Sequence, residues 1–366
     1  MKDGKSRMHP TPGEVRDGTV APAPSASRML RYVHRVCPIA IALLCACGGT
    51  SVRTDVYVAG YVNNGAGLTA TLWTNGNPVA LTAEPQRSVA TAVTVSEIGD
   101  VYVAGCASRT SVDMAVYWKN GVLVALTDGT RQACAEAIAI SGGHVYAAGY
   151  ETYRAPVATF WRDGIETLLT DGTSLADAVS IAVSGGDVHI AGYQITNTQV
   201  APNEFVIADV ARYWKNGVAT ALTDGKNEGV ANSVALSGRD VYVAGWEGAG
   251  PVFVAKVWKN GAPVALTDGA LSAKAMAVTL RGSDVLAVGA QSNGSLDVPT
   301  IWTNGSAARL GAKDQAFAEA IAIAGNDVFV AGYDGASAVY WKNGIANPLT
   351  HGSGDADAAS IAVYQH

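Results

Sequence analysis

Residues 115–129 read AVYWKNGVLVALTDG, and the phrase returns as AKVWKNGAPVALTDG at 255–269 and as AVYWKNGIANPLTHG at 338–352. Its constant part is a Trp, any residue, Asn or Asp, and then Gly. This part begins at seven of the eight tryptophans in the chain: Trp73, Trp118, Trp161, Trp214, Trp258, Trp302 and Trp341. Self-similarity at a spacing of about 40 residues is typical of solenoids, propellers and related arrays.

A second, apolar phrase precedes each Trp and ends in Ala-Gly or Val-Gly, as in DVYVAGY at 55–61 and DVYVAGW at 240–246. Asn-Gly suits a two-residue hairpin turn because both central residues take positive φ. Each unit therefore predicts four short strands: an Ala-rich strand, the Ala-Gly strand, a strand ending at the Trp, and a strand after Asn-Gly. Their nearly continuous apolar composition predicts strands buried on both faces, as in stacked sheets.

The two ends of the repeat region complement each other. The first unit begins directly at DVYVAGY, and the chain finishes with ADAASIAVYQH at 356–366, an Ala-rich strand with no Ala-Gly strand after it. An open solenoid would instead need polar caps at both ends. The sequence therefore predicts an all-β, seven-bladed β-propeller over residues 55–366. Each blade has four antiparallel strands, and the C-terminal strand completes the first blade and closes the ring.

The first 46 residues differ from the repeats in kind. Residues 1–28 have no apolar periodicity, so we expect them to be disordered or to precede the true translation start. Arg28, Arg31 and Arg35 then precede an apolar run at 36–46. A run of this length is too short to span a bilayer, and its charge order is that of a secretory signal over residues 29–46.

The end of this signal, Leu44-Cys45-Ala46-Cys47, resembles the lipobox of bacterial lipoproteins. The resemblance implies that Cys47 is the lipid attachment site and that residues 47–54 form a short tether. It also implies anchoring at the bacterial cell envelope, in the outer membrane, on its periplasmic or surface face. An ordinary cleaved signal peptide is the alternative.

Charge and cysteine content restrict the ligands and the compartment. Loss of residues 1–46 would leave 18 Lys and Arg against 28 Asp and Glu, a net charge of −10. An acidic surface disfavours nucleic acid and anionic lipid head groups as ligands. Cys106 and Cys134 are the two cysteines of the repeat region; they predict a disulfide in an oxidising envelope, with two buried free thiols as the alternative.

One polar residue stands among alanines near the start of each innermost strand. We expect these residues to surround the mouth of the central channel: Thr91, Glu136, Asp177, Asn232, Lys274, Glu319 and Asp357. Four of them are acidic and could hold a cation such as Ca²⁺ through oxygen ligands; a solvated rim is the alternative. The alignment of this strand between units is open by two residues.

Two kinds of loop share that face. Asp-Gly pairs between units, at Asp128, Asp171, Asp224 and Asp268, predict turns in which the carboxylate accepts local backbone N–H bonds. The longest departure from the repeat is YQITNTQVAPNEFVIADVARY at 193–213, which we interpret as an extended loop that carries binding groups. A neutral insertion is the alternative.

The repeats are similar to the Trp/Asn-Gly repeats of uncharacterised bacterial propeller lipoproteins over about residues 51–366. That resemblance implies the fold and the location, and it implies no activity. Neither a zinc-ligand spacing nor a nucleophile elbow appears in the sequence. We therefore expect a monomeric binding scaffold for a protein, glycan or small molecule. The alternative is a metal-assisted enzyme, such as a lyase or lactone hydrolase, which needs several channel-mouth carboxylates to converge.

Overall fold

The computed structural model describes residues 52–63, 65, 67–83, 87–108, 111–201, 204–249, 251–311, 315–350 and 355–366. Within these residues, 28 strands form seven four-stranded antiparallel sheets. No helix in the described part of the chain has the length and apolar character needed to cross a membrane. The predicted signal segment and Cys47 lie outside the described residues.

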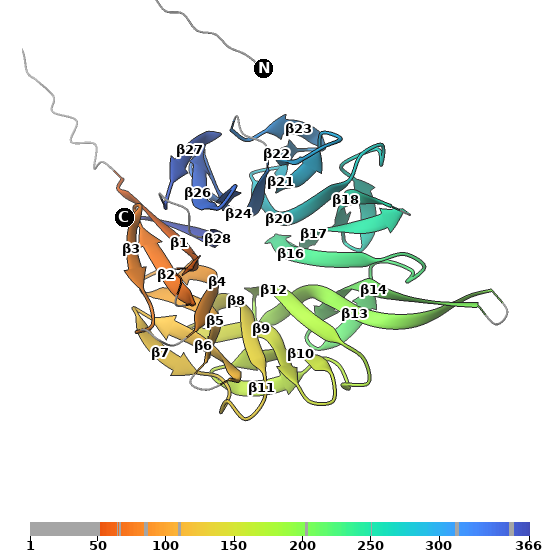
Figure 1. Ribbon diagram of the computed structural model, residues 1–366, viewed down its shortest axis with the longest axis horizontal. Coiled ribbons are helices and arrows are strands. Elements are labelled where there is room, and N and C mark those ends of the chain that lie inside the picture. The colour runs from red at the N-terminus through yellow and green to blue at the C-terminus, as the bar shows by residue number, and fades with distance from the viewer. Residues whose placement is uncertain are drawn as a thin grey trace, which may run out of the picture. The chain divides into compact units, whose positions relative to one another are not determined.

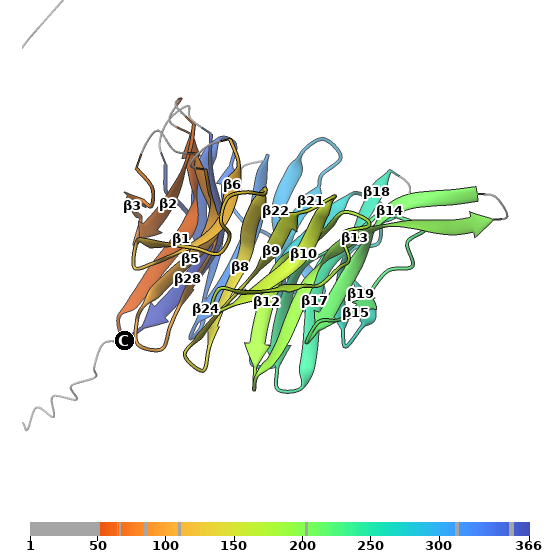
Figure 2. The same ribbon diagram turned by 90° about the horizontal axis from the view of Figure 1, so that it is seen from below.

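Each sheet is one blade, and the blades follow one another around a ring (Figures 1 and 2). From the innermost strand outward, blade one consists of β28 (Ala356–Gln365), β1 (Thr54–Asn63), β2 (Leu68–Thr74) and β3 (Asn77–Ala80), and blade two of β4 (Ser88–Val95), β5 (Val101–Ser108), β6 (Asp113–Lys119) and β7 (Val122–Ala125). Blade three consists of β8 (Ala133–Ser141), β9 (His144–Thr152), β10 (Pro156–Arg162) and β11 (Ile165–Leu168). Blade four consists of β12 (Ala176–Ser184), β13 (Asp187–Ala201), β14 (Glu204–Lys215) and β15 (Val218–Ala221). In the same order, blade five consists of β16 (Gly229–Ser237), β17 (Asp240–Ala249), β18 (Val252–Lys259) and β19 (Ala262–Ala265). Blade six consists of β20 (Ala273–Arg281), β21 (Asp284–Ser292), β22 (Asp297–Thr303) and β23 (Ser306–Arg309). Blade seven consists of β24 (Ala316–Ala324), β25 (Asp327–Asp334), β26 (Ser337–Lys342) and β27 (Ile345–Pro348).

Ring closure follows the prediction from the chain ends. β28, the last strand of the chain, pairs antiparallel with β1, the first, with Val58 opposite Ile361 and Thr54 opposite Gln365. The first blade therefore contains strands from both ends of the repeat region. Closure covers the strand edge that the first unit would otherwise expose.

The hairpin turns after each Trp have the predicted geometry. Both central residues have positive φ in every blade, as at Asn120 (50°) and Gly121 (81°). Because Asn tolerates this region and Gly enters it freely, the pair Asn-Gly or Asp-Gly is the local reason for the turn. The repeated phrase at 115–129 is thus the outer hairpin of one blade.

A side-chain clamp ties the start of each second strand to this turn. In the second blade, Asn120 Nδ2 donates to Asp100 (2.8 Å), and Asn120 Oδ1 accepts from the backbone N–H of Val101 (2.8 Å). The same two bonds recur in five other blades. In the third blade His144 stands in place of the Asp and Asp163 in place of the Asn, and His144 Nδ1 lies 2.6 Å from an Asp163 carboxylate oxygen. The clamp explains why the apolar Ala-Gly phrase usually begins with Asp and why Asn stands two residues after the Trp in the other phrase.

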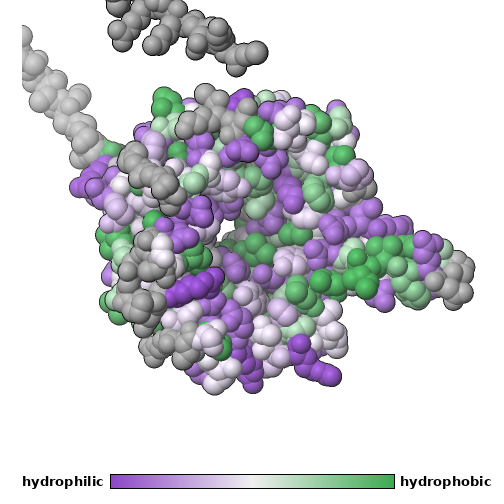
Figure 3. All heavy atoms as spheres, in the orientation of Figure 1, coloured by the Kyte–Doolittle hydropathy of each residue, from purple (hydrophilic) through white to green (hydrophobic). Residues whose placement is uncertain are grey.

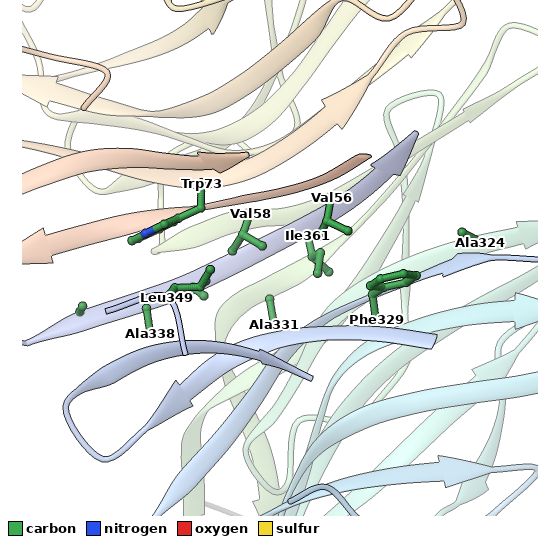
Figure 4. Packing of buried hydrophobic residues seen from close by; sticks show 11 residues of the cluster. Val56, Val58, Trp73, Ala324, Phe329, Ala331, Ala338, Leu349 and Ile361 are labelled. Carbon is green, nitrogen blue, oxygen red and sulfur yellow. The ribbon is translucent and has the colours of Figure 1, made fainter. Parts of the chain in front are cut away.

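The seven repeat tryptophans lie between neighbouring blades, and each is at most 2% exposed. Trp73 of the first blade belongs to one apolar cluster with Phe329 and Leu349 of the seventh (Figure 4). Each of the other six shares an apolar cluster with the preceding blade. Burying a ring of this size contributes about 2–3 kcal/mol, so the tryptophans stabilise the contacts between blades.

The outermost strands depart from the prediction of burial on both faces. β3, β11, β15, β19 and β23 are exposed along their whole length, and β7 and β27 are nearly so. Blades diverge towards the circumference of a ring, so the outer strands have no neighbouring sheet to pack against. Apolar residues there, such as Val122 and Ile345, serve strand pairing rather than the core.

Candidate functional site

A β-bulge in the first strand of every blade sets the geometry of the channel mouth. In the third blade, Ala135 and Ala137 pair with consecutive residues of β9, so Glu136 is the extra residue. A Cβ on Gly149 would lie 2.0 Å from the carbonyl oxygen of Cys134, and the six equivalent glycines have the same contact at 1.9–2.0 Å. The bulge thus explains why the second strand always contains Gly at this point.

The bulge also divides the predicted ring of polar residues into two positions. The bulge position holds Thr91, Glu136, Val179, Asn232, Met276, Glu319 and Ala359. The position two residues earlier holds Val89, Cys134, Asp177, Val230, Lys274, Phe317 and Asp357. The alignment, which the sequence left open by two residues, is thereby decided: Thr91, Glu136, Asn232 and Glu319 are the unpaired bulge residues, and Asp177, Lys274 and Asp357 lie two residues earlier.

Polar side chains at the bulge position reach the next blade. Thr91 Oγ1 donates to the carbonyl oxygen of Ala135 (2.6 Å), which joins blades two and three. Asn232 Nδ2 donates to the carbonyl oxygen of Ala275 (2.9 Å), which joins blades five and six. The bulge position is thus a hydrogen-bonding position between blades, and its partner is a backbone carbonyl.

Glu136 of the third blade lies beside Asp177 of the fourth. Burial raises the pKa of Glu136 to about 8, and the negative charge of Asp177 adds to that rise. Burial also raises the pKa of Asp177 to about 7, partly offset by the N–H of Ala178. The Oδ1 atom of Asp177 is shielded from solvent and has no hydrogen-bond partner among the described residues. Near neutral pH, this pair holds at least one proton.

Glu319 of the seventh blade and Asp357 of the first repeat this arrangement. Burial, followed by the charge of Asp357, raises the pKa of Glu319 to about 8. The pKa of Asp357 rises to about 6 because burial outweighs the N–H of Ala358. Its Oδ1 atom likewise lacks both solvent and a partner within the described part of the chain. The four predicted acids therefore form two pairs at two separate interfaces.

Four tyrosines border the two pairs, and the sequence reading missed them. Tyr150 and Tyr193 interact with the Glu136 pair, and Tyr61 and Tyr333 with the Glu319 pair. Burial is the main reason that the pKa values of Tyr193 and Tyr333 rise to about 12. Each Tyr directly follows the Gly of a second strand, and this position holds Tyr only in the four blades that flank the pairs. That coincidence was the signal in the sequence.

The remaining predicted site residues lie at two other interfaces. Cys106 on β5 and Cys134 on β8 form a disulfide, with an S–S distance of 2.14 Å, between blades two and three. Lys274 Nζ lies 4.4 Å from the ring centres of both Trp246 and Phe253, between blades five and six. Lys274 is therefore held by cation–π contacts at some distance in the ring from the acidic pairs.

The structure does not gather the carboxylates into one cation site. Across the described residues, no group of three or more His, Cys, Asp and Glu side chains is placed to hold a metal ion. Ca²⁺ takes six to eight oxygen ligands, so each carboxyl pair would need further oxygens from backbone or water. Calcium binding at the channel mouth stays a prediction.

The Asp-Gly loops are turns of the predicted kind. Asp128 accepts the backbone N–H of Thr130 (2.8 Å), and Asp171 accepts that of Thr173 (3.0 Å). The bonds at Asp224 and Asp268 are equivalent. The hydroxyls of Thr130 and Thr173 also donate to these carboxylates (2.6 and 2.7 Å) and are the main reason that the pKa values of Asp128 and Asp171 are lowered, followed by the backbone N–H bonds.

A polar pocket of about 440 Å³ lies between the loops of blades six and seven. Its lining includes Asp297, Gln315 and Tyr333. Gln315 has a positive φ of 62°, and its N–H donates to the carbonyl oxygen of Asp297 (3.0 Å) while its carbonyl accepts from Gly335 (3.0 Å). The pocket thus has a tied backbone wall on the side of blade seven.

The 193–213 segment is a long hairpin, which corrects the prediction of a loop. β13 and β14 stay paired out to Ala201 opposite Glu204, and the hairpin projects from the ring (Figures 1 and 2). The long strand β14 is favoured by its sequence, because half of its residues are β-branched or aromatic. Figure 3 shows apolar side chains along this hairpin and a hollow at the centre of the ring.

The two faces of the hairpin differ. A Cβ on Gly225 would lie 2.5 Å from Thr198 Oγ1 and 3.0 Å from Val210 Cγ2, so the Asp-Gly loop covers that face. Phe205 and Ile207 alternate with those residues and occupy the other face. Phe205 is 57% exposed and Ile207 is 72% exposed. Two large apolar side chains therefore lie close together on one exposed face of the hairpin.

No protein-family model and no curated protein matches the chain. Among solved structures, it is similar to putative TolB from Agrobacterium tumefaciens, with 12% identity and a TM-score of 0.42 over 71% of this chain and 88% of that one. It is also similar to the tricorn protease, with 8% identity and a TM-score of 0.49 over 84% of this chain. The chain spans 36% of the tricorn protease chain. The seven blades are established by the strand pairing of the chain itself.

Proposed function

We propose that this protein is a lipid-anchored scaffold of the bacterial cell envelope that binds a protein partner through the β13–β14 hairpin. The observation that carries the proposal is the exposed apolar face formed by Phe205 and Ile207 on a hairpin that projects from a rigid ring. Binding groups presented on a rigid scaffold are a common arrangement in proteins.

The outer part of the hairpin offers both apolar surface and strand edges. Pairing between β12 and β13 ends at Gln194, and pairing between β14 and β15 begins at Arg212. Beyond those points the hairpin is a two-stranded ribbon, which is only marginally stable without further strands or a covered face. A protein partner could cover Phe205 and Ile207 and add a strand to either edge.

The enzyme alternative is less well supported. A metal-assisted lyase or hydrolase needs several carboxylates to converge on one substrate, whereas the four acids are divided between two interfaces. Burial also raises the pKa of all four carboxyls, which disfavours the ionised form that a metal requires. Binding is therefore the function that the geometry favours.

Photo-crosslinking in intact cells tests the binding surface. With a photoreactive residue at position 205 or 207, we expect one crosslinked product of defined mass, because a partner that covers the apolar face lies within reach. The matched controls are positions 165 and 218, where Ile165 and Val218 are as exposed as Ile207 but lie on outer strands. The same product from control and hairpin positions would sink the proposal. A product of twice the chain mass would mean that the occupant is a second copy.

Fractionation tests the anchor. Acylation needs the thiol of Cys47, so we expect Cys47→Ala to move the protein from the membrane fraction to the soluble fraction and to abolish palmitate labelling. Cys37→Ala, in the apolar run of the signal, is the control and should keep both properties. Continued sedimentation of Cys47→Ala with membranes, together with processing that globomycin does not inhibit, would rule out the lipoprotein.

A further inference from the structure

We infer that Glu136 and Glu319 act as protonated hydrogen-bond donors between blades, so that two of the seven blade interfaces, including the one that closes the ring, depend on bound protons. This property is separate from partner binding by the hairpin. It makes the propeller a protein whose ring closure is sensitive to alkaline pH.

The repeat supplies the geometric argument. The four polar residues at the bulge position are Thr91, Glu136, Asn232 and Glu319. Thr91 and Asn232 both donate to the carbonyl oxygen of the alanine that precedes the bulge in the next blade, Ala135 or Ala275.

For Glu136 and Glu319, the equivalent carbonyls belong to Ala178 and Ala358. A carboxylate has no proton to donate and would be repelled by a carbonyl oxygen, whereas a protonated carboxyl can donate as Thr and Asn do. The same backbone partner therefore favours the neutral form of Glu136 and Glu319. An ionised Glu would also leave that carbonyl without the bond that it accepts at the Thr91 and Asn232 interfaces.

The neighbouring titratable groups act in the same direction. Those that face Glu136 are Asp177 on β12, Tyr150 on β9 and Tyr193 on β13. Around Glu319 they are Asp357 on β28, Tyr333 on β25 and Tyr61 on β1, with Asp297 and Asp355 acting on the tyrosines. All these groups are acids, so ionisation of either Glu adds a negative charge to a partly buried acidic pair. The raised pKa of each Glu agrees with this arrangement.

The sign of the pH effect follows from proton linkage. The folded protein keeps protons on Glu136 and Glu319 up to a pKa of about 8, whereas the unfolded chain releases them near the ordinary glutamate pKa of 4.5. Between these values the folded state binds more protons than the unfolded state. The free energy of unfolding therefore falls as pH rises through this window, and these groups add no further loss above it.

Melting temperature against pH tests the inference on the wild type, on Glu136→Gln, on Glu319→Gln and on the double variant. We expect the wild-type melting temperature to fall by about 5 °C or more between about pH 6 and about pH 9. A Gln amide keeps a donor at every pH, so each variant should show a shallower fall and should exceed the wild type at about pH 9. Thr91→Val is the control, because it removes a donor at the same position and should lower the melting temperature equally at all pH values.

Two results would overturn the inference. The first is a pH dependence that is the same in the wild type and in the double variant, since the carboxyls would then carry no proton-linked bond. The second is a rise in the wild-type melting temperature with millimolar Ca²⁺ at about pH 8 that EDTA reverses and the double variant lacks. That result would mean that the carboxyls hold a cation and are ionised in the folded state.

Discussion

Deletion of residues 356–366 is expected to remove the cooperative unfolding transition of the ring, or to lower the free energy of unfolding by more than about 5 kcal/mol. The deletion takes away the strand that pairs with β1 and three members of the cluster around Trp73, namely Ala356, Ala358 and Ile361. It also exposes the edge of β1 and the Glu319 interface at once. Thermal and denaturant unfolding measure the effect.

Two controls make this prediction specific to strand exchange. Deletion of residues 365–366 alone removes the last paired residue of β28 and the two backbone hydrogen bonds between Arg53 and His366, all at the end of the strand, and should cost far less stability. A synthetic peptide of residues 355–366, added to the truncated protein, should bind and restore the transition. The reason is that β28 is the edge strand of its sheet and pairs with β1 alone. Full stability of the truncated protein without the peptide would refute closure by the C-terminal strand.

The second large effect is expected for Gly245→Ala, which should lower the free energy of unfolding by more than about 3 kcal/mol. The added Cβ would lie 2.0 Å from the backbone carbonyl oxygen of Val230 and 3.0 Å from Cζ3 of Trp258. Neither neighbour can move freely, since one is backbone at the bulge and the other is a fully buried ring. Urea unfolding measures the loss.

Gly238→Ala is the matched control. Gly238 has a φ of 59° and no atom within 4 Å of its would-be Cβ, so Ala there costs only the backbone strain of about 1 kcal/mol. Both variants add one methyl group to the same blade. Equal losses would mean that the close approach at the bulge does not decide why the second strand contains Gly.

Sequence spacing was enough to predict elements that depend on local chemistry. The Asn-Gly turns and the four strands of each unit were readable, because each depends on residues close together in one repeat. Closure was readable for a related reason. The first unit lacks its Ala-rich strand, and the C-terminal segment is an Ala-rich strand with no Ala-Gly strand after it. A complete four-stranded blade forms only if these two pair with each other.

The 193–213 hairpin and the outermost strands show where the reading stopped. Segment length was read correctly in the former, but whether added residues form a loop or longer strands depends on a β13–β14 register that continues to Ala201. In the outer strands, apolar composition suggested burial, but burial depends on whether another blade is near. Both questions concern neighbours that are distant in sequence.

The sequence by itself determined the number of blades, the strand order within them and the closure of the ring. Turns and strand order are decided within one repeat, and closure follows from the complementary ends of the repeat region. Only the tertiary structure decided which polar groups meet across the blades. Glu136 is the bulged residue of its blade and Asp177 lies two residues before the bulge of the next blade, yet the two side chains meet across the interface. The same offset relates Glu319 to Asp357, and a disulfide joins Cys106 on a second strand to Cys134 on the first strand of the next blade. Contacts between blades have no backbone ladder to fix them, so their partners are decided by how whole sheets pack.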